Sequence, residues 1–195
     1  MLKRTLRSLA ILSALVALPV LAEQSEWAID AGHTRVGFSV THMVISEVDG
    51  DFKKFGGKAL LDDKDLTKSS VEFSIDAASI NTDNADRDKH LRSPEFFDVE
   101  KFPKLTFQST KITKAGKGYK LKGNLTIHGV TKEVTLDAQV SEPVANPWGK
   151  QVRGVKLTGK IKREDFGLTW NKALDKGGVV LGNDVTINIK LELNK

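Results

Sequence analysis

Four histidines are the residues of this 195-residue chain that first suggest chemistry. His33 and His42 are an odd number of positions apart, so on one extended segment they point to opposite faces. His90 falls in a segment of helical character and His128 in a turn. The chain contains no HxH, HxxxH or HExxH pattern and no cysteine, so the ligand spacings of zinc sites are missing. The sequence therefore predicts no metal site, and His42 is interpreted as a hydrogen-bonded residue near the end of a strand.

The motifs of common enzyme classes are missing as well. Serine and histidine occur, but the chain has no GxSxG elbow, no phosphate-binding loop and no GxGxxG fingerprint. Carboxylates gather at Asp62-Asp63 and within residues 83–88, in surroundings typical of solvated turns. We therefore expect a protein that is not an enzyme and has no catalytic residues, although a lipid-modifying enzyme remains a lower-ranked alternative.

One segment concentrates cations beside apolar side chains, and it has two interpretations. Its polar members are Arg87, His90 and Arg92, and its apolar members include Phe96 and Phe97. In the first interpretation it forms a lid, where the aromatic rings close a cavity and the cations meet a polar head group. In the second it is an exposed helix, stabilised by an Asp88–Arg92 pair at i,i+4, whose aromatic residues only plug the end of the fold.

The basic charge of the chain is concentrated at its N-terminus. The formal net charge is +5, but three of the positive charges are Lys3, Arg4 and Arg7. They precede an apolar run over residues 9–21, which is followed by Ala22. This pattern is typical of a cleavable secretory signal peptide, and the run is too short for a membrane-spanning helix. We expect residues 1–22 to be removed, leaving an exported protein with no stable membrane insertion. Since most of the positive charge leaves with them, no nucleic-acid partner is expected.

The rest of the chain, residues 23–195, is predicted to form one all-β domain. Apolar and polar residues alternate with period two, which is typical of strands with one buried face. The strong segments are 35–42, 71–77, 119–128, 134–140, 155–161 and 185–193, and weaker ones lie near 52–61 and 105–112. One or two short helices are expected around residues 82–102, beginning at Ser93-Pro94 because proline suits the first helical position.

About eight antiparallel strands can form a sandwich or a closed barrel. The length of the strands favours a barrel, which leaves no exposed edge, and Gly37, Gly123 and Gly159 suit the bends of such a wall. An outer-membrane barrel would need an uninterrupted lipid-facing band with aromatic girdles. Residues such as His42 and Lys111 interrupt the apolar pattern, so a soluble eight-stranded antiparallel barrel is preferred.

Several blocks of the sequence resemble the YceI-like family of periplasmic, lipocalin-like, polyisoprenoid-binding proteins. Among them are WAID at residues 27–30, RDKHLRSPEFFD at 87–98, GNLTIHGVTK at 123–132 and REDFGL at 163–168. The resemblance implies a lipocalin-like barrel that encloses an apolar cavity for an isoprenoid tail, in a Gram-negative periplasm. The Gly-x-Trp entry motif of true lipocalins is absent, because Ser25-Glu26 precedes Trp27.

The resemblance and the strand pattern together give candidate ligand-binding residues. Those expected to line a lipid cavity are Phe38, Val40, His42, Leu125, Ile127, Leu136, Ile187 and Ile189. Those expected at a head group or in a lid are Arg87, His90, Arg92, Phe96 and Phe97. The expected ligand is a non-covalently bound isoprenoid quinone or polyprenyl phosphate, with no other cofactor, and a homodimer is left open. The alternative is a periplasmic stress or interaction protein whose barrel is packed solid and binds no lipid.

Overall fold

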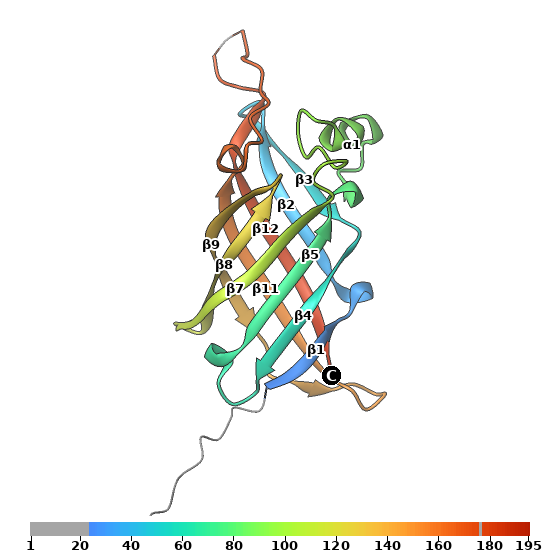
Figure 1. The fold of residues 1–195 in the computed structure, drawn as a ribbon, viewed down its shortest axis with the longest axis vertical. Coiled ribbons are helices and arrows are strands. Elements are labelled where there is room, and N and C mark those ends of the chain that lie inside the picture. Colours follow the sequence, from blue (N-terminus) through green and yellow to red (C-terminus); the bar gives the residue numbers. More distant parts are fainter. Residues whose placement is uncertain (1–23, 176) are drawn as a thin grey trace, which may run out of the picture.

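The computed structural model describes residues 24–175 and 177–195, and the predicted signal peptide lies outside them. Within these residues twelve strands form one continuous sheet (Figure 1). The strands are β1 (Gln24–Ile29), β2 (Arg35–His42), β3 (Ser46–Phe52), β4 (Phe55–Asp62), β5 (Ser70–Asp76), β6 (Ile80–Asn81), β7 (Lys104–Ala115), β8 (Gly118–Ile127), β9 (Val130–Val140), β10 (Val144–Ala145), β11 (Gln151–Lys162) and β12 (Leu181–Asn194).

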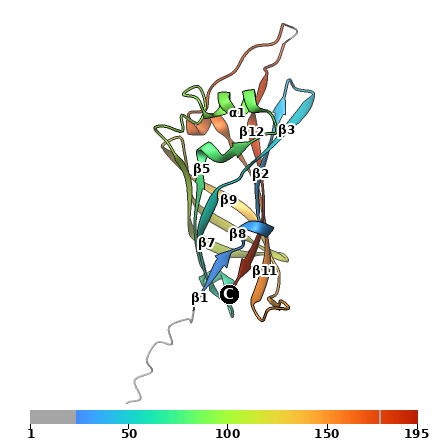
Figure 2. The same cartoon turned by 90° about the vertical axis from the view of Figure 1, so that its right-hand side faces the viewer.

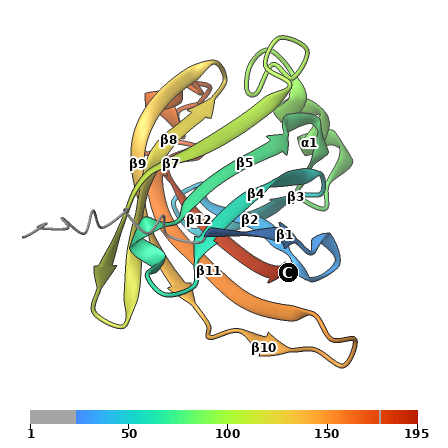
Figure 3. The same ribbon diagram turned by 60° about the horizontal axis from the view of Figure 1, so that its bottom comes forward.

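The sheet closes into an eight-stranded antiparallel barrel, as the sequence predicted. The ring runs β11–β9–β8–β7–β5–β4–β1–β12, and β12 pairs with β11 from Val152↔Asn194 to Lys162↔Asp184 to complete it. The short β10 extends β11 outside the ring, where the two strands form a protruding hairpin (Figure 3). No helix of the described residues is long and apolar enough to cross a membrane.

Three of the eight barrel strands are each divided into two segments: β1 and β2, β3 and β4, and β5 and β6. β1 pairs with β4 toward the C-terminal end, whereas β2 pairs with β3 toward the opposite end, and the 3₁₀ turn η1 (Ala31–His33) separates β1 from β2. The 3₁₀ turn η3 (Ala77–Ser79) separates β5 from β6 in the same way. The predicted strand at 52–61 is therefore wrong in its bounds, since β3 ends at Phe52 and β4 begins at Phe55.

The end of the barrel opposite the C-terminus carries the helix α1 (Ala85–Arg92) (Figures 1 and 2). Asn84 starts the helix, because its side-chain oxygen accepts the Arg87 N–H at 2.9 Å. The predicted helix start at Ser93-Pro94 is wrong: Ser93 follows the last helical residue. A helix rarely continues through the residue before a proline, so this dipeptide ends α1 instead of beginning a helix.

The apolar face of every long strand points into the barrel. Buried clusters form around Val36 and Phe166 at the α1 end, around Leu121 and Leu157 at mid-height, and around Trp27 at the C-terminal end. Two further 3₁₀ turns, η2 (Leu66–Lys68) and η4 (Arg163–Phe166), lie at the rims. This orientation is the reverse of that in an outer-membrane barrel, whose apolar face points outward.

Candidate binding cavity

The barrel is hollow. A cavity of about 310 Å³ occupies the half nearer α1, a volume at the lower end of those of small-molecule sites. A smaller cavity of about 70 Å³ lies closer to the C-terminal end. Side chains therefore do not fill the interior, and a solidly packed barrel, the alternative considered from the sequence, is not what the structure shows.

All eight residues that the sequence predicted to line a cavity contribute to the wall of the larger one. They are Phe38, Val40, His42, Leu125, Ile127, Leu136, Ile187 and Ile189. Leu125, Ile187 and Ile189 are only half-buried although they point inward, because they face the empty space. Ile127 and Leu136 also border the cavity but are buried, because neighbouring side chains cover most of their surface.

Glycines on β8 and β11 help to keep the interior open. A Cβ on Gly123 would lie 2.4 Å from Cζ of Phe107, and one on Gly159 would lie 2.5 Å from Cδ2 of Leu136. Because no real Cβ tolerates such distances, these two glycines provide the space in which Phe107 and Leu136 lie against the barrel wall. The two side chains would otherwise extend further into the cavity.

The two cavities share part of their walls. Both are lined by Val71, Phe73, Leu121, Leu157 and Leu191. These apolar side chains lie between the two spaces, so the cavities adjoin each other inside the barrel. An extended apolar chain entering from the α1 end would pass Arg87 and the buried Arg163 and would then meet mainly apolar side chains.

Trp27 and Arg153 close the C-terminal end. Trp27 is 1 % exposed, and the Arg153 guanidinium carbon lies 5.2 Å from the centroid of its ring. Arg153 Nη2 donates to Asp63 Oδ1 at 3.1 Å, and Lys195 Nζ lies 3.3 Å from the other oxygen of that carboxylate. These residues form a plug, and the cavity consequently has one candidate entrance, at the α1 end.

Four of the five predicted lid residues line the cavity at that end. Arg87, His90, Phe96 and Phe97 contribute to its wall, but Arg92 does not. The Arg92 guanidinium instead donates from Nε to the Ala78 carbonyl at 2.8 Å and from Nη2 to the Ile80 carbonyl at 2.7 Å. Arg92 therefore anchors α1 to the backbone around η3, a tertiary contact that sequence spacing could not indicate.

Thr82 organises the inner side of α1. Its N–H and hydroxyl both donate to Asp88 Oδ1, at 2.9 and 2.5 Å, and Asp88 is buried. Its own hydroxyl and carbonyl oxygens accept hydrogen bonds from Nε and Nη2 of Arg87, at 2.7 and 2.5 Å. The exposed Asp88–Arg92 pair considered from the sequence is therefore not formed, because each residue bonds to a different segment. Arg87 is held in place at the cavity wall.

Aromatic packing completes this end. The His90 ring lies edge-on to Phe96 and to Trp170, with centroids 5.0 and 5.1 Å apart, and His90 Nε2 is hydrogen-bonded to the Glu95 carboxylate. Trp170 also lines the cavity but was missed from the sequence. It lies in an irregular segment just after the REDFGL block, where no periodic signal marks an inward-facing residue.

Arg163 is a second cavity residue that sequence reasoning missed. It is buried, and its guanidinium donates to the carbonyls of Gly182 and Leu168. Burial lowers the pKa of Arg163 from its ordinary value, and the nearby Glu164 carboxylate opposes this shift. Because its donors are directed to backbone oxygens, Arg163 ties η4 to the start of β12 and shapes the wall beside the entrance. Arg163 follows the last residue of β11 and continues the inward parity of Leu157 and Ile161, which was the signal that could have revealed it.

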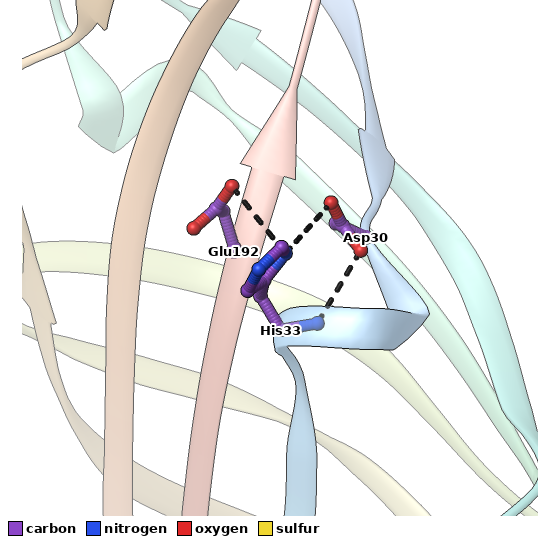
Figure 4. Close-up of side chains that lie close together, drawn as sticks. All are labelled: Asp30, His33 and Glu192. Atoms are coloured by element: carbon purple, nitrogen blue, oxygen red, sulfur yellow. Dashed lines mark hydrogen bonds and ion pairs between the residues drawn. The ribbon is translucent and has the colours of Figure 1, made fainter. Parts of the chain in front are cut away.

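His33 lies outside the cavity. Its Nδ1 is 3.1 Å from Asp30 Oδ2 and 4.0 Å from Glu192 Oε1, which connects the β1–β2 junction to β12 (Figure 4). The hydrogen bond to Asp30 and the charges of Asp30 and Glu192 hold the pKa of His33 above its ordinary value. The same hydrogen bond lowers the pKa of Asp30. His42, in contrast, lines the cavity, so the two histidines do point to opposite sides.

An eight-stranded antiparallel barrel with an apolar interior cavity, one plugged end and a short helix at the other end defines the class of the protein. The model of the YceI-like domain matches residues 27–193, and the chain belongs to this family. A UPF0312 protein of Serratia proteamaculans is 46% identical over 137 residues, covering 70% of this chain and 71% of its own length.

Solved structures share the fold. BcnA of Burkholderia cenocepacia superposes with a TM-score of 0.74 at 25% identity, covering 84% of this chain and 98% of that one. A polyisoprenoid-binding domain of Saccharophagus degradans, implicated in plant cell wall breakdown, gives a TM-score of 0.59 at 17% identity and covers 86% and 97%. These likenesses confirm the predicted barrel, and the domain match confirms the predicted family.

Proposed function

We propose that this protein binds and carries an isoprenoid lipid whose tail occupies the barrel. The observation that carries the proposal is the cavity of about 310 Å³, whose wall is apolar except at the α1 end. The plug of Trp27 and Arg153 closes the other end. The tail therefore enters first, and the head group stays near α1. The polyisoprenoid-binding description of the Saccharophagus degradans domain, which has the same fold, supports this ligand class.

The length of the barrel limits how the tail is held. Strands of about ten residues at ~3.3 Å per residue, tilted by ~40°, enclose a depth of roughly 25 Å. A tail longer than this depth bends within the cavity or protrudes at the entrance. Burial worth about 0.8 kcal/mol per CH₂ would give tight binding without a specific polar contact.

The head group is proposed to lie beside Arg87 and His90. Arg87 is fixed by Thr82 at the cavity wall, so a cation is already positioned at the entrance. A guanidinium can donate two charge-assisted hydrogen bonds to a phosphate, whereas a quinone carbonyl requires only a neutral donor. A polyprenyl phosphate and an isoprenoid quinone are therefore both candidate ligands, and they should differ in their dependence on Arg87.

We also propose that the protein works in the periplasm as a binding protein and not as an enzyme. The support for export is the sequence of residues 1–22, with its cationic start, apolar run and terminal Ala22. Cell fractionation and N-terminal sequencing test it, and the expected first residue of the mature protein is Glu23. Light scattering of the mature protein tests whether it forms the homodimer left open by the sequence.

Native mass spectrometry of protein purified from its own host tests the proposed ligand directly. The expected result is a stoichiometric adduct that organic extraction releases as an isoprenoid lipid. Recovery of empty barrel, combined with no uptake of added isoprenoid quinone or polyprenyl phosphate, would overturn the proposal. Chemical change of the bound lipid over time would favour the enzyme alternative.

A further inference from the structure

An apolar tip protrudes beside the entrance to the cavity. It consists of Met43, Val44 and Ile45, between β2 and β3, together with Val179 of the segment that precedes β12. Val44 is 65% exposed and Ile45 86% exposed. Figure 2 shows the β2–β3 hairpin and the segment before β12 extending at the same end of the barrel as α1. A cluster of large apolar side chains in water is costly unless something covers it.

The apolar tip is continuous with the cavity wall. The Met43 N–H donates to the Val180 carbonyl at 2.8 Å, which holds the two segments of the tip together. His42 and Val180, the chain neighbours of Met43 and Val179, both line the cavity, as does Leu181. The exposed residues of the tip are therefore directly adjacent along the chain to residues of the cavity wall.

The backbone conformation of the tip is unusual for the residue types that it contains. Met43 has a φ of 50° and Val44 a φ of 66°, values at which tight hairpins usually carry asparagine or glycine. A β-branched residue is a particularly poor choice at positive φ. Apolar residues at this position are therefore unfavourable in two ways: they strain the turn, and they are exposed to water. Such local conflicts are expected at functional sites.

We propose that the apolar tip docks on a lipid bilayer and places the cavity entrance against it. This inference rests on the proposed function, because an isoprenoid lipid is dissolved in bilayers and would pass directly from one apolar environment to another. Residues 43–45 and Val179 are uncharged, and the sequence of the segment 172–179 carries Lys172, Asp175 and Lys176, a net charge of only +1. Insertion is thus driven by apolar burial, and the docking should depend little on salt.

Vesicle flotation of the mature protein tests the docking by itself. The probe is vesicles of phosphatidylcholine, and the variant is Val44→Asn with Ile45→Ser. Asparagine tolerates positive φ better than valine, so this variant should melt no lower than the wild type. Loss of two inserted branched side chains should reduce the apparent vesicle affinity by about tenfold or more, at low and physiological salt alike.

The β10–β11 hairpin at the opposite end offers a matched control. Val144 is 60% exposed and Trp148 84% exposed, close to the values for Val44 and Ile45. The variant Val144→Asn with Trp148→Ser removes a comparable apolar surface far from the entrance. It should bind vesicles within about twofold of the wild type. An equal loss of affinity in both double variants would overturn the proposal, because it would show non-specific adsorption.

A transfer assay connects the docking to the cavity. An isoprenoid quinone is delivered to the empty barrel either from phosphatidylcholine vesicles or from detergent micelles. The variant of the tip should slow uptake from vesicles by about tenfold and leave uptake from micelles unchanged. Unchanged uptake from vesicles would overturn the docking. A tip that pairs two copies of the chain, and does not contact the bilayer, would give this result. Lack of uptake from micelles by the wild type would instead contradict the proposed function, while flotation would still report on docking.

Discussion

The guanidinium carbon of Arg153 lies over the indole of Trp27, 5.2 Å from the ring centroid, and makes a cation–π contact at the closed end of the barrel. Both side chains are almost completely buried. Arg153 Nε has no hydrogen-bond partner among the described residues, so the cation depends on the indole and on Asp63 for its stabilisation. A charge is thus held where an apolar residue could have closed the barrel.

This arrangement predicts that substitution of Asp63 and substitution of Arg153 change the free energy of unfolding by different amounts. Arg153 is 4% exposed, whereas Asp63 is 39% exposed. Asp63→Ala leaves a buried guanidinium without its carboxylate. Breaking a fully buried pair costs about 3–5 kcal/mol, and the loss here should be smaller because solvent reaches Asp63. Arg153→Met replaces the cation by an apolar side chain that still covers Trp27, and its effect should be much smaller or even stabilising. Urea unfolding of both variants measures the difference, and a larger loss in Arg153→Met would contradict it.

The pair of Asp30 and His33 gives a prediction for pH. Because Asp30 raises the pKa of His33, the protonated histidine stabilises the folded state fully below the ordinary pKa of about 6.5. This contribution is lost as the pH rises through the folded-state pKa. The pKa of Asp30 is lowered, so its own contribution is present above about 3.8 and is lost as the pH falls below that range.

Titration of the His33 ring by NMR checks the assignment. In the wild type His33 should titrate above its ordinary value, and Asp30→Asn should bring the pKa down, since it removes the largest cause of the shift. Asparagine can still accept the Gly32 N–H at the start of η1, so the turn should be retained. Glu192→Gln should lower the pKa by less. An unaltered titration in Asp30→Asn would show that the hydrogen bond does not form in solution.

The barrel could be predicted from the sequence because its long strands alternate strictly. β12 presents Val185, Ile187 and Ile189 on one face, and this regularity follows directly from the two-residue period of a strand. β1 was missed because its six residues include only one fully buried side chain, Trp27, which is too little alternation to recognise. The helix was misplaced because Ser93-Pro94 is equally compatible with a helix start and a helix end.

The cavity could not be predicted from the same pattern. Inward-facing apolar residues look identical in the sequence whether they fill the barrel or surround an empty space. The difference arises from contacts between strands, such as the position of Phe107 over Gly123. The role of Arg92 was likewise beyond sequence reasoning, because its partners are backbone carbonyls of residues 78 and 80 brought near by folding.

Arg87 and Arg92 should respond differently to substitution. Arg87→Gln removes a cation from the cavity wall, so polyprenyl-phosphate binding should weaken by far more than quinone binding. Arg92→Gln leaves the wall intact but removes charge-assisted hydrogen bonds to two carbonyls, which should lower stability by about 1.5–3 kcal/mol and leave the preference between ligands unchanged. Affinities for both ligands and thermal melting of both variants separate the two roles. A loss of phosphate preference in Arg92→Gln alone would place the head group elsewhere.

Two tryptophan substitutions distinguish a half-buried cavity residue from one whose surface is mostly covered by neighbouring side chains. Ile187 is half-buried and borders the cavity, with Gly159 opposite it on β11. Ile187→Trp should occupy volume that the lipid tail needs, so the variant should keep its melting temperature and lose most of its lipid.

Ile127 also borders the cavity but is fully buried. Ile127→Trp should overpack its surroundings and lower stability by about 1–3 kcal/mol. Melting curves of ligand-free protein, compared with the lipid content of protein purified from its host, measure both effects. Similar destabilisation by both substitutions, with lipid retained, would mean that the tail does not occupy the space beside Ile187.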